Sequence, residues 1–161
     1  MGAWGARMSL ATDYELRVLE SILRYQLGIE IKLDDIKARL TVVRSRKTGR
    51  IKQVLIDGKL FATIRASDGF IILSKEGWRT VIELAQGGSL PCVTVPDDVA
   101  TFVADGRTLF SKHVVASDGE ILPGDEVCVK SERGEVVGAG RAMLPGWEMG
   151  RTKRGKAVKT R

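Results

Sequence analysis

The chain has 161 residues, of which 43% are hydrophobic and 29% are charged, and its 26 Lys and Arg against 20 Asp and Glu give a formal net charge of +6. This length suits one or two small domains and is too short for a catalytic (β/α)8 barrel, which takes about 250 residues. No run approaches the roughly 18 apolar residues of a membrane-spanning helix, so we expect no membrane-bound protein.

The clearest element of the first half is an amphipathic helix over residues 14–27. Its apolar residues recur at steps of three and four, which places them on one face. Thr12 followed by Glu15 matches a capping box at the start, and Gly28 supplies the left-handed residue that closes a helix. A short helical turn is expected next, over residues 33–40.

The sequence between residues 41 and 74 has β character. Lys47–Arg50 and Asp57-Gly58 have the glycine chemistry of tight hairpins, so we expect a small antiparallel sheet. A second amphipathic helix is predicted over residues 75–86, and Gly87-Gly88 should end it.

We place a domain boundary just after this helix, which gives a first domain over residues 1–88 and a second over residues 89–161. In the second domain, Pro96 precedes a short helix over residues 97–104, and several short β runs are then separated by glycine-containing turns. This pattern is typical of a small barrel or sandwich.

The residues that enzymes use are scarce. Two distant cysteines, Cys92 and Cys128, and a single histidine, His113, cannot supply the four ligands of a structural zinc site. We expect buried, inert thiols in a reducing cytoplasm, and a His113 without a catalytic partner. The segment GAGRAM from residue 138 lacks the third glycine of a dinucleotide fingerprint. We therefore expect no catalytic residue, no metal and no small-molecule cofactor.

The net charge is concentrated in the last eleven residues. They contain six basic side chains and no acid, so the rest of the chain is electrically balanced. Such a block is typical of proteins that bind a polyanion. Ala157 and Val158 fit a terminal strand that the cations would decorate, and the alternative is a solvated, frayed terminus. The six basic residues are Arg151, Lys153, Arg154, Lys156, Lys159 and Arg161.

A second basic cluster surrounds the first predicted hairpin. Its cations could track phosphates, although charge that only keeps a hairpin tip soluble is the interpretation we favour. The segment from Arg65 to Gly69 fits either an RNA-facing motif or, as we favour, a turn with a local ion pair. The hairpin cluster consists of Arg44, Arg46, Lys47, Arg50 and Lys52.

Three segments of the second half resemble the PUA domain, the RNA-binding module named for pseudouridine synthases and archaeosine transglycosylases. They are FVADGRTLFSKHVV from residue 102, ILPGDEVCVKSERGEVVGAGRAML from residue 121 and GKAVKTR from residue 155. The matching elements are the glycine loop Asp105–Arg107, the turn Gly124–Val127, the strand Gly138–Ala142 and the closing Gly155–Val158. This resemblance implies a small pseudo-barrel of mostly antiparallel strands.

The first half resembles the region that precedes the PUA domain in archaeosine tRNA-guanine transglycosylase. The matching segments are RYQLG from residue 24, SRKTGRIK from residue 45 and FATIRASDGFIILSKEG from residue 61. We therefore predict an α+β fold, with an N-terminal α/β pre-PUA-like domain followed by a PUA-like pseudo-barrel. The catalytic barrel of that family, with its aspartate nucleophile and zinc cysteines, has no counterpart in these 161 residues.

The same resemblance implies a binding surface. In that family the PUA domain grips the acceptor stem and 3′ CCA end of tRNA, with the glycine loop and the last strand close to the RNA. His113 is a departure, because many PUA domains have a glycine there, and it affects the path expected for the RNA 3′ end. The residues to which the resemblance assigns RNA binding are Gly106, Arg107, Lys112, Lys153, Arg154, Lys156 and Lys159.

From the charge and the resemblance we predict a non-catalytic, cytoplasmic RNA-binding protein that recognises the acceptor stem and 3′ end of tRNA in tRNA modification. The alternative is a protein-interaction or specificity subunit of a separate tRNA-guanine modification enzyme. The expected partner is tRNA, joined in the alternative by a catalytic subunit, with no membrane and no small-molecule cofactor.

Overall fold

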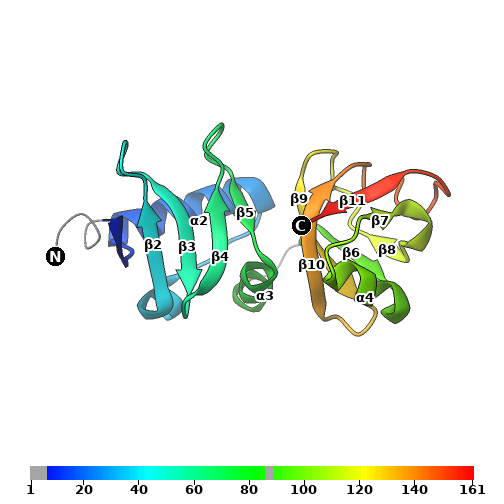
Figure 1. The fold of residues 1–161 in the computed structure, drawn as a ribbon, viewed down its shortest axis with the longest axis horizontal. Coiled ribbons are helices and arrows are strands. Elements are labelled where there is room, and N and C mark those ends of the chain that lie inside the picture. Colours follow the sequence, from blue (N-terminus) through cyan, green and yellow to red (C-terminus); the bar gives the residue numbers. More distant parts are fainter. Residues whose placement is uncertain (1–6, 86–88) are drawn as a thin grey trace. The chain divides into compact units, whose positions relative to one another are not determined.

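A computed structural model describes residues 7–85 and 89–161 of the chain. The chain divides into two compact units, residues 1–88 and residues 89–161 (Figure 1). Each unit combines helices with a mainly antiparallel sheet, so the predicted α+β class is confirmed.

The first unit is built on a five-stranded sheet whose neighbouring strands are consecutive in sequence and antiparallel. The two predicted hairpins connect its second, third and fourth strands. The first strand was not expected, because three residues leave no periodic pattern in a sequence. The strands are β1 (Met8–Leu10), β2 (Leu40–Arg44), β3 (Ile51–Ile56), β4 (Lys59–Ile64) and β5 (Ile71–Leu73).

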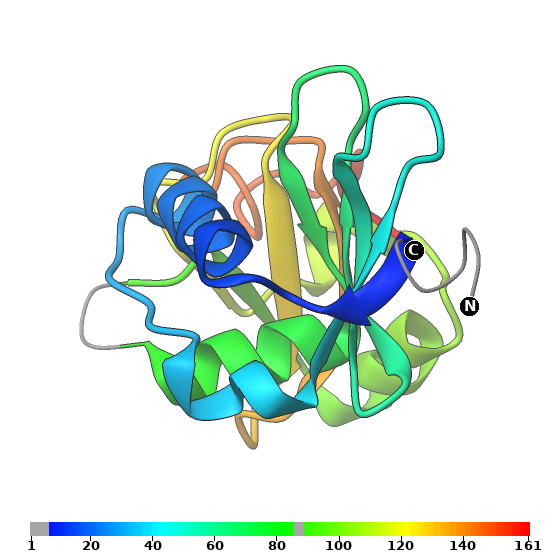
Figure 2. The same cartoon turned by 90° about the vertical axis from the view of Figure 1, so that its left-hand side faces the viewer.

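Helix α2 (Asp13–Leu27) lies along one face of this sheet (Figures 1 and 2). It begins with the predicted capping box: the Glu15 N–H donates to Thr12 Oγ1 at 3.1 Å, and the Thr12 N–H donates to Glu15 Oε1 at 3.0 Å. Gly28 ends it in the left-handed conformation, with φ of 69°. Both ends of the helix are therefore fixed by local signals that the sequence displays.

Apolar side chains hold α2 on the sheet. The leucines of the helix that face inward are at most 3% exposed. The four cross-strand partners in the centre of the sheet are at most 4% exposed. Burial of this kind contributes about 25 cal/mol for each Å² of apolar surface removed from water. The helix residues are Leu16, Leu19 and Leu23, and the sheet row is Val42, Val54, Ala62 and Leu73.

Two further helices complete the unit. The predicted helical turn is the 3₁₀ helix η1 (Asp34–Arg39), and the second predicted helix is α3 (Lys75–Leu84). In α3 the Gly77 N–H donates to the Ser74 hydroxyl at 3.0 Å, which caps the start. The helix ends two residues before the predicted Gln86, and the Gly87-Gly88 stop signal lies outside the described residues.

An ion pair joins α2 to the end of β2. Arg44 donates two hydrogen bonds to the Glu15 carboxylate, at 2.8 and 2.6 Å, and the two side chains are only 14% and 15% exposed. The guanidinium of Arg44, through these hydrogen bonds, holds the pKa of the Glu15 carboxyl below its ordinary value. Arg44 is therefore engaged inside the unit, whereas the other four cations of the basic hairpin are exposed.

Replacing Glu15 by glutamine should lower the free energy of unfolding by about 2 kcal/mol at pH 7, because the largely buried Arg44 would lose the carboxylate to which it donates two hydrogen bonds. The folded-state pKa of Glu15 is depressed, so the contribution of the pair is present above the unfolded pKa and is lost as pH falls through the folded pKa. Urea denaturation of the wild type should therefore show stability falling below about pH 4.3, and Glu15→Gln should lose less over that range.

The exposed Glu132, replaced by glutamine, is the control for that experiment, because its loss removes a carboxylate without leaving a half-buried cation. Equal stability of Glu15→Gln and the wild type at pH 7 would contradict the assigned role of the pair.

The second unit is a six-stranded sheet that curls around its own core, in the order β7-β11-β10-β9-β6-β8. Strands β6 and β9 pair in parallel, and the remaining neighbours pair antiparallel, as predicted for a mostly antiparallel pseudo-barrel. Its elements are β6 (Cys92–Val95), α4 (Asp97–Ala104), β7 (Leu109–Phe110), η2 (Ser111–His113), β8 (Ala116–Ser117), β9 (Glu126–Ser131), β10 (Val136–Ala142) and β11 (Lys156–Thr160).

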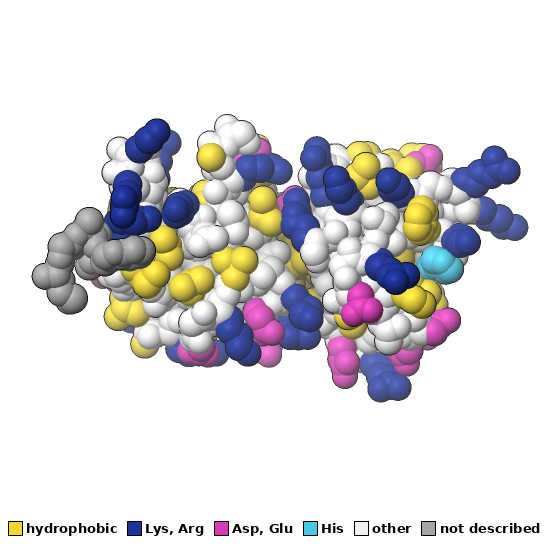
Figure 3. Space-filling view, in the orientation of Figure 1, with side chains coloured by type: hydrophobic (Ala, Val, Ile, Leu, Met, Phe, Trp, Pro, Cys, Tyr) yellow, Lys and Arg dark blue, Asp and Glu magenta, His cyan; other side chains and the backbone are white. Residues whose placement is uncertain are grey.

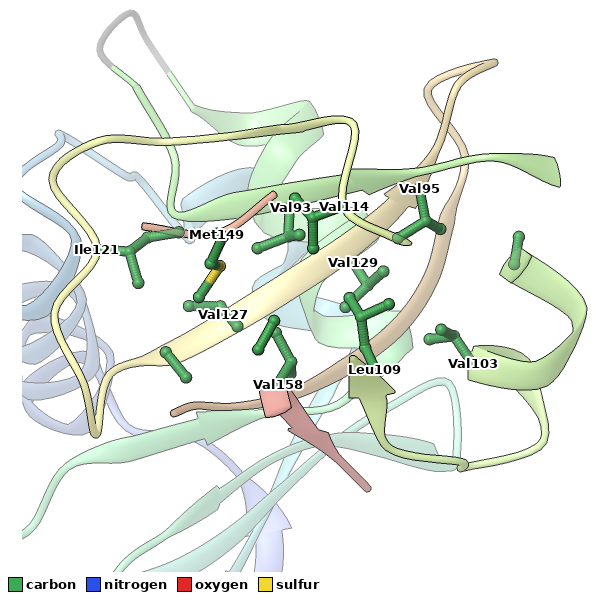
Figure 4. Close-up of a cluster of buried hydrophobic side chains, with 13 residues drawn as sticks. Val93, Val95, Val103, Leu109, Val114, Ile121, Val127, Val129, Met149 and Val158 are labelled. Carbon is green, nitrogen blue, oxygen red and sulfur yellow. The ribbon is translucent and has the colours of Figure 1, made fainter. Parts of the chain in front are cut away.

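The core of this unit is filled by hydrophobic side chains from β6, β7, β9, β10 and β11, from α4 and from the connecting segments (Figure 4). Such a unit has about seventy residues, so its core is small, and curling the sheet removes edges that would otherwise be open. The buried cluster consists of Val93, Val95, Ala100, Val103, Leu109, Val114, Ile121, Val127, Val129, Ala142, Met149, Ala157 and Val158.

The expectation of free thiols is wrong. Cys92 and Cys128 are buried, as expected, but they form a disulfide. The parallel pairing of β6 with β9 makes the two cysteines direct partners, with Cα atoms 4.6 Å apart, inside the usual range for a disulfide. The sequence could not reveal this, because pairing depends on a register between strands that are far apart in the chain. Cysteine usage therefore no longer supports a reducing compartment.

Candidate nucleic-acid interface

The basic end of the chain is an ordered strand within the sheet of the second unit. Strand β11 lies between β7 and β10, and it is not a frayed terminus. Ala157 and Val158 are both fully buried in the core, although consecutive strand residues ordinarily face opposite sides. A register shift between Lys156 and Val158, in the pairing with β7, accompanies this departure from alternation. Lys156 and Lys159 remain exposed on either side of the buried pair.

The loop before β11 carries two more of the predicted residues, Lys153 and Arg154, and both are exposed. Ser111 fastens both ends of this loop. Its hydroxyl accepts from the Gly150 N–H at 3.1 Å, and its own N–H donates to the Gly155 carbonyl at 3.0 Å. Ser111 is completely buried, so these hydrogen bonds are shielded from water.

The role of Ser111 was missed by the sequence analysis, because a single serine between Phe110 and Lys112 carries no recognisable signal. Its consequence is structural: η2 is held against the loop, so the exposed Lys112 directly follows a residue that is bonded to both ends of the loop carrying Lys153 and Arg154. Figure 3 shows Lys and Arg side chains along β11 and the loop that precedes it.

The glycine loop lies toward the other end of β11. Gly106 follows α4 with φ of 84°, a conformation that favours glycine, and its N–H donates to the Val103 carbonyl at 2.9 Å. The Arg107 guanidinium lies 5.4 Å from the centre of the exposed Phe102 ring, a cation–π contact. Because Leu109 pairs with Val158, the chain that enters β7 runs beside the second half of β11.

The seven predicted residues thus form two groups along one strand. Lys159 follows Lys156 by three positions along the strand, which corresponds to roughly 10 Å. The first group consists of Lys112, Lys153, Arg154 and Lys156, and the second consists of Gly106, Arg107 and Lys159.

One further cation belongs to the second group. Arg141 on β10 is the direct cross-strand partner of Lys159, and both side chains are exposed. Like charges placed directly opposite each other destabilise a sheet unless an anion lies between them. Glu126 on β9 is the strand partner of Arg141 on its other side, but its carboxylate forms an ion pair with Arg161. The Arg161 Nη2 donates to Glu126 Oε2 at 3.0 Å. The pair of Arg141 and Lys159 therefore suits a phosphate group.

The glycines of GAGRAM serve packing, not phosphate binding. A Cβ atom on Gly138 would lie 2.8 Å from the Val103 side chain of α4. A Cβ atom on Gly140 would lie 2.8 Å from the Val158 side chain and closer still to the Lys159 backbone oxygen. Both glycines let neighbouring elements approach β10 closely.

Replacing Gly140 by alanine should lower the free energy of unfolding by about 2–3 kcal/mol, because the added methyl group must push β11 away from β10. Chemical denaturation followed by circular dichroism measures this. Gly119→Ala is the matched control, since a Cβ atom there meets open space and its φ is not in the left-handed region. Equal stability of the two variants would contradict the close approach.

Metal and membrane sites find no support among the described residues. No group of three or more His, Cys, Asp and Glu side chains there could hold a metal ion. Within the same residues, no helix is long and apolar enough to cross a membrane. His113 is exposed in η2, and Arg65 forms the expected local ion pair with Asp68 at 2.7 Å.

Comparison with known families identifies the class of both units. Residues 91–161 match the PUA domain, and residues 17–86 match the patch-forming domain C2 of tRNA-guanine transglycosylase. The structure of a conserved PUA domain protein from Thermoplasma acidophilum has a TM-score of 0.69 at 25% identity, covering 96% of this chain and 91% of that chain. A protein from Pyrococcus horikoshii shares the fold, with a TM-score of 0.67 at 19% identity over 96% of this chain and 92% of that one. The second unit thus matches the PUA domain, and the chain has the fold of a PUA domain protein.

Its sequence relatives are more specific. The tRNA-guanine(15) transglycosylase of Methanococcus aeolicus is 34% identical over 152 residues, which covers 89% of this chain and 22% of that protein. The enzyme of the same name from Pyrococcus furiosus is 39% identical over 119 residues, covering 74% of this chain and 20% of that protein. The chain therefore resembles the C-terminal part of the archaeal transglycosylases and spans about a fifth of their length.

Proposed function

We propose that the protein is a non-catalytic RNA-binding protein that recognises the acceptor stem and 3′ end of tRNA during tRNA modification. The observation that carries this proposal is the ordered basic strand β11, with the loop and 3₁₀ helix that place further cations beside it. Ordered cations lose less conformational entropy on binding a phosphate backbone than a flexible tail does. A cytoplasmic location belongs to the same proposal.

The two groups along β11 suit two different parts of a tRNA. The cations at the start of the strand suit the phosphates of a helical stem, which they would bind without regard to sequence. The second group pairs Arg107 and Lys159 with Gly106, where the absence of a side chain permits close approach of a backbone. Two exposed aromatic rings offer stacking surfaces for unpaired bases: Phe102, which Arg107 contacts, and Phe110, whose strand partner is Lys156.

The choice of tRNA over other RNAs rests on the relatives. Two relatives that match along 89% and 91% of this chain are named tRNA-guanine(15) transglycosylases. In this proposal the protein contributes RNA binding to such chemistry and leaves catalysis to other polypeptides.

Titration of the full chain with tRNA at several salt concentrations tests the proposal. We expect micromolar or tighter binding whose equilibrium constant falls steeply with salt, because each neutralised phosphate releases counterion. Absent binding, or binding that does not depend on salt, would overturn it.

A second candidate function is that of a specificity subunit for a separate tRNA-guanine modification enzyme. The face of the first sheet opposite α2 carries exposed apolar side chains at Met8, Leu10 and Leu60, which would suit a protein partner. Affinity purification from the native cell should then recover a transglycosylase. Recovery of this chain alone would argue against the subunit role while leaving RNA binding intact.

A further inference from the structure

The first unit contains a cavity of about 600 Å³ between α2 and the tips of two hairpins, the β2–β3 loop and the β4–β5 loop. Its volume falls within the range of about 300–1,000 Å³ typical of ligand pockets. Helix α2 contributes Tyr14, Val18 and Ile22 to the wall, and Ile51 and Ile64 face them from the strands. The walls are therefore mainly apolar.

The helix side of this groove includes one aromatic ring, that of Tyr14. Tyr14, Val18, Ile22 and Tyr25 follow one another at steps of four, four and three, so they form a single stripe along α2. This stripe is distinct from the leucines that face the core. Tyr14 and Tyr25 are 76% and 79% exposed, which leaves both rings accessible.

The opposite rim is basic. Arg46, Lys47 and Arg50 lie on the tip of the β2–β3 hairpin, all exposed, and the segment from Ser45 to Lys52 contains no acid. Figure 3 shows Lys and Arg side chains gathered on this hairpin.

The hairpin tip is held in a defined shape. The Ser45 N–H donates to the Arg50 carbonyl at 2.8 Å, and the Gly49 N–H donates to the Ser45 carbonyl at 2.9 Å. The Ser45 hydroxyl accepts from the Lys47 N–H at 3.2 Å. The three cations are therefore carried by an ordered backbone, which lowers the entropic cost of binding an anion.

The other charges near the groove are balanced internally. Glu15 and Arg44, which line the groove, pair with each other, and Arg65 on the neighbouring hairpin pairs with Asp68. Among the described residues that line the groove, Arg50 is the charged side chain outside these pairs, and the exposed Arg46 and Lys47 lie on the same β2–β3 hairpin. An apolar groove with an aromatic residue at its mouth and a basic rim is complementary to a nucleotide, which joins an apolar ring to a phosphate.

We propose that this groove binds an unpaired nucleotide of RNA, with the base against Tyr14 and the apolar wall and the adjacent phosphates on Arg46, Lys47 and Arg50. Stacking on an aromatic ring accepts any base, since every base has a π face. A protein partner would need about 800 Å² of surface on each side, whereas this groove is the size of a small ligand. The proposal rests on RNA binding as the protein's function and adds a second contact outside the PUA domain.

A single-stranded oligoribonucleotide of about eight nucleotides, labelled with a fluorophore, is the probe for this groove. Titrated with the full chain, Tyr14→Ala should weaken binding about tenfold, and Tyr14→Phe should restore it, because the phenyl ring still stacks. Tyr14 is exposed in the first turn of α2, so neither change should unfold the protein. Circular dichroism of both variants checks this.

Replacing Arg46, Lys47 and Arg50 by glutamine should also weaken binding of the probe. The slope of the logarithm of the binding constant against the logarithm of the salt concentration should become shallower by about 2, because each contact with a single strand contributes roughly 0.7. The matched control replaces Lys32, Lys37 and Lys59 in the same unit, which are exposed and lie outside the groove, and it should retain wild-type affinity. Equal loss in both triple variants would mean that only overall charge matters, and it would overturn the proposal.

The outcomes separate this proposal from the function on which it rests. If neutralising the β11 cations abolishes tRNA binding while Tyr14→Ala and the hairpin variant bind the single-stranded probe normally, the groove proposal fails and the PUA proposal stands. If the wild type binds neither tRNA nor the probe, both fail. Capture of a protein by the groove, lost in Tyr14→Ala while probe binding is unchanged, would also overturn the nucleotide assignment.

Discussion

Replacing Lys153, Arg154, Lys156 and Lys159 together by glutamine should flatten the salt dependence of tRNA binding. Each contact between a cation and a phosphate of a double helix contributes about 0.9 to the logarithmic slope, so four contacts contribute about 3.6. The wild type should therefore lose about 150-fold more affinity than the variant between 50 and 200 mM salt. Fluorescence titration across that range measures both slopes.

The matched control for this experiment removes four exposed cations of the first unit, Arg17, Lys32, Lys37 and Lys59. It changes the net charge by the same amount but leaves the β11 surface intact, so its slope should equal that of the wild type. The β11 variant should remain folded, because the buried side chains of the strand, Ala157 and Val158, are unchanged. Equal slopes in all three proteins would contradict the assignment of the surface.

Reduction of the Cys92–Cys128 disulfide should lower the free energy of unfolding of the second unit by about 4 kcal/mol. The bond closes a loop with a sequence separation of 36, and the chain-entropy estimate for such a loop is close to that value. Against a typical stability of 5–15 kcal/mol, the loss is large, and the thermal midpoint should fall clearly. Urea denaturation with and without a thiol reductant gives the difference.

The double variant Cys92→Ser and Cys128→Ser provides the control for that measurement. It should match the reduced wild type approximately and should not respond to the reductant. Two titratable thiols in the unfolded, unreduced wild type would show that the bond does not form, and they would contradict this prediction.

Local signals made the helices predictable. The capping box of Thr12 and Glu15 and the left-handed Gly28 lie within a few residues of the ends that they define, so the sequence contains the whole interaction. The C-terminal strand was predictable because the apolar Ala157 and Val158 lie between cations. That both side chains are buried was not predictable, because it accompanies an irregular register that no periodicity reveals.

Contacts between distant segments were not predictable in the same way. The disulfide depends on the parallel register of β6 and β9, and the engagement of Arg44 depends on Glu15, which lies on a different element. The position of Lys112 beside the β11 loop depends on the hydrogen bonds of Ser111. For the site, residue types and strand placement could be predicted from the sequence, whereas the grouping along β11 required the fold.

Recognition of the acceptor end of tRNA by the β11 surface is tested most directly by comparing intact tRNA with the same tRNA lacking its 3′ CCA. Both RNAs should be titrated against the full chain at two salt concentrations. We predict that the trimmed tRNA binds more weakly at both, and that the β11 variant loses the difference. Equal affinity for the two RNAs in the wild type would contradict acceptor-end recognition.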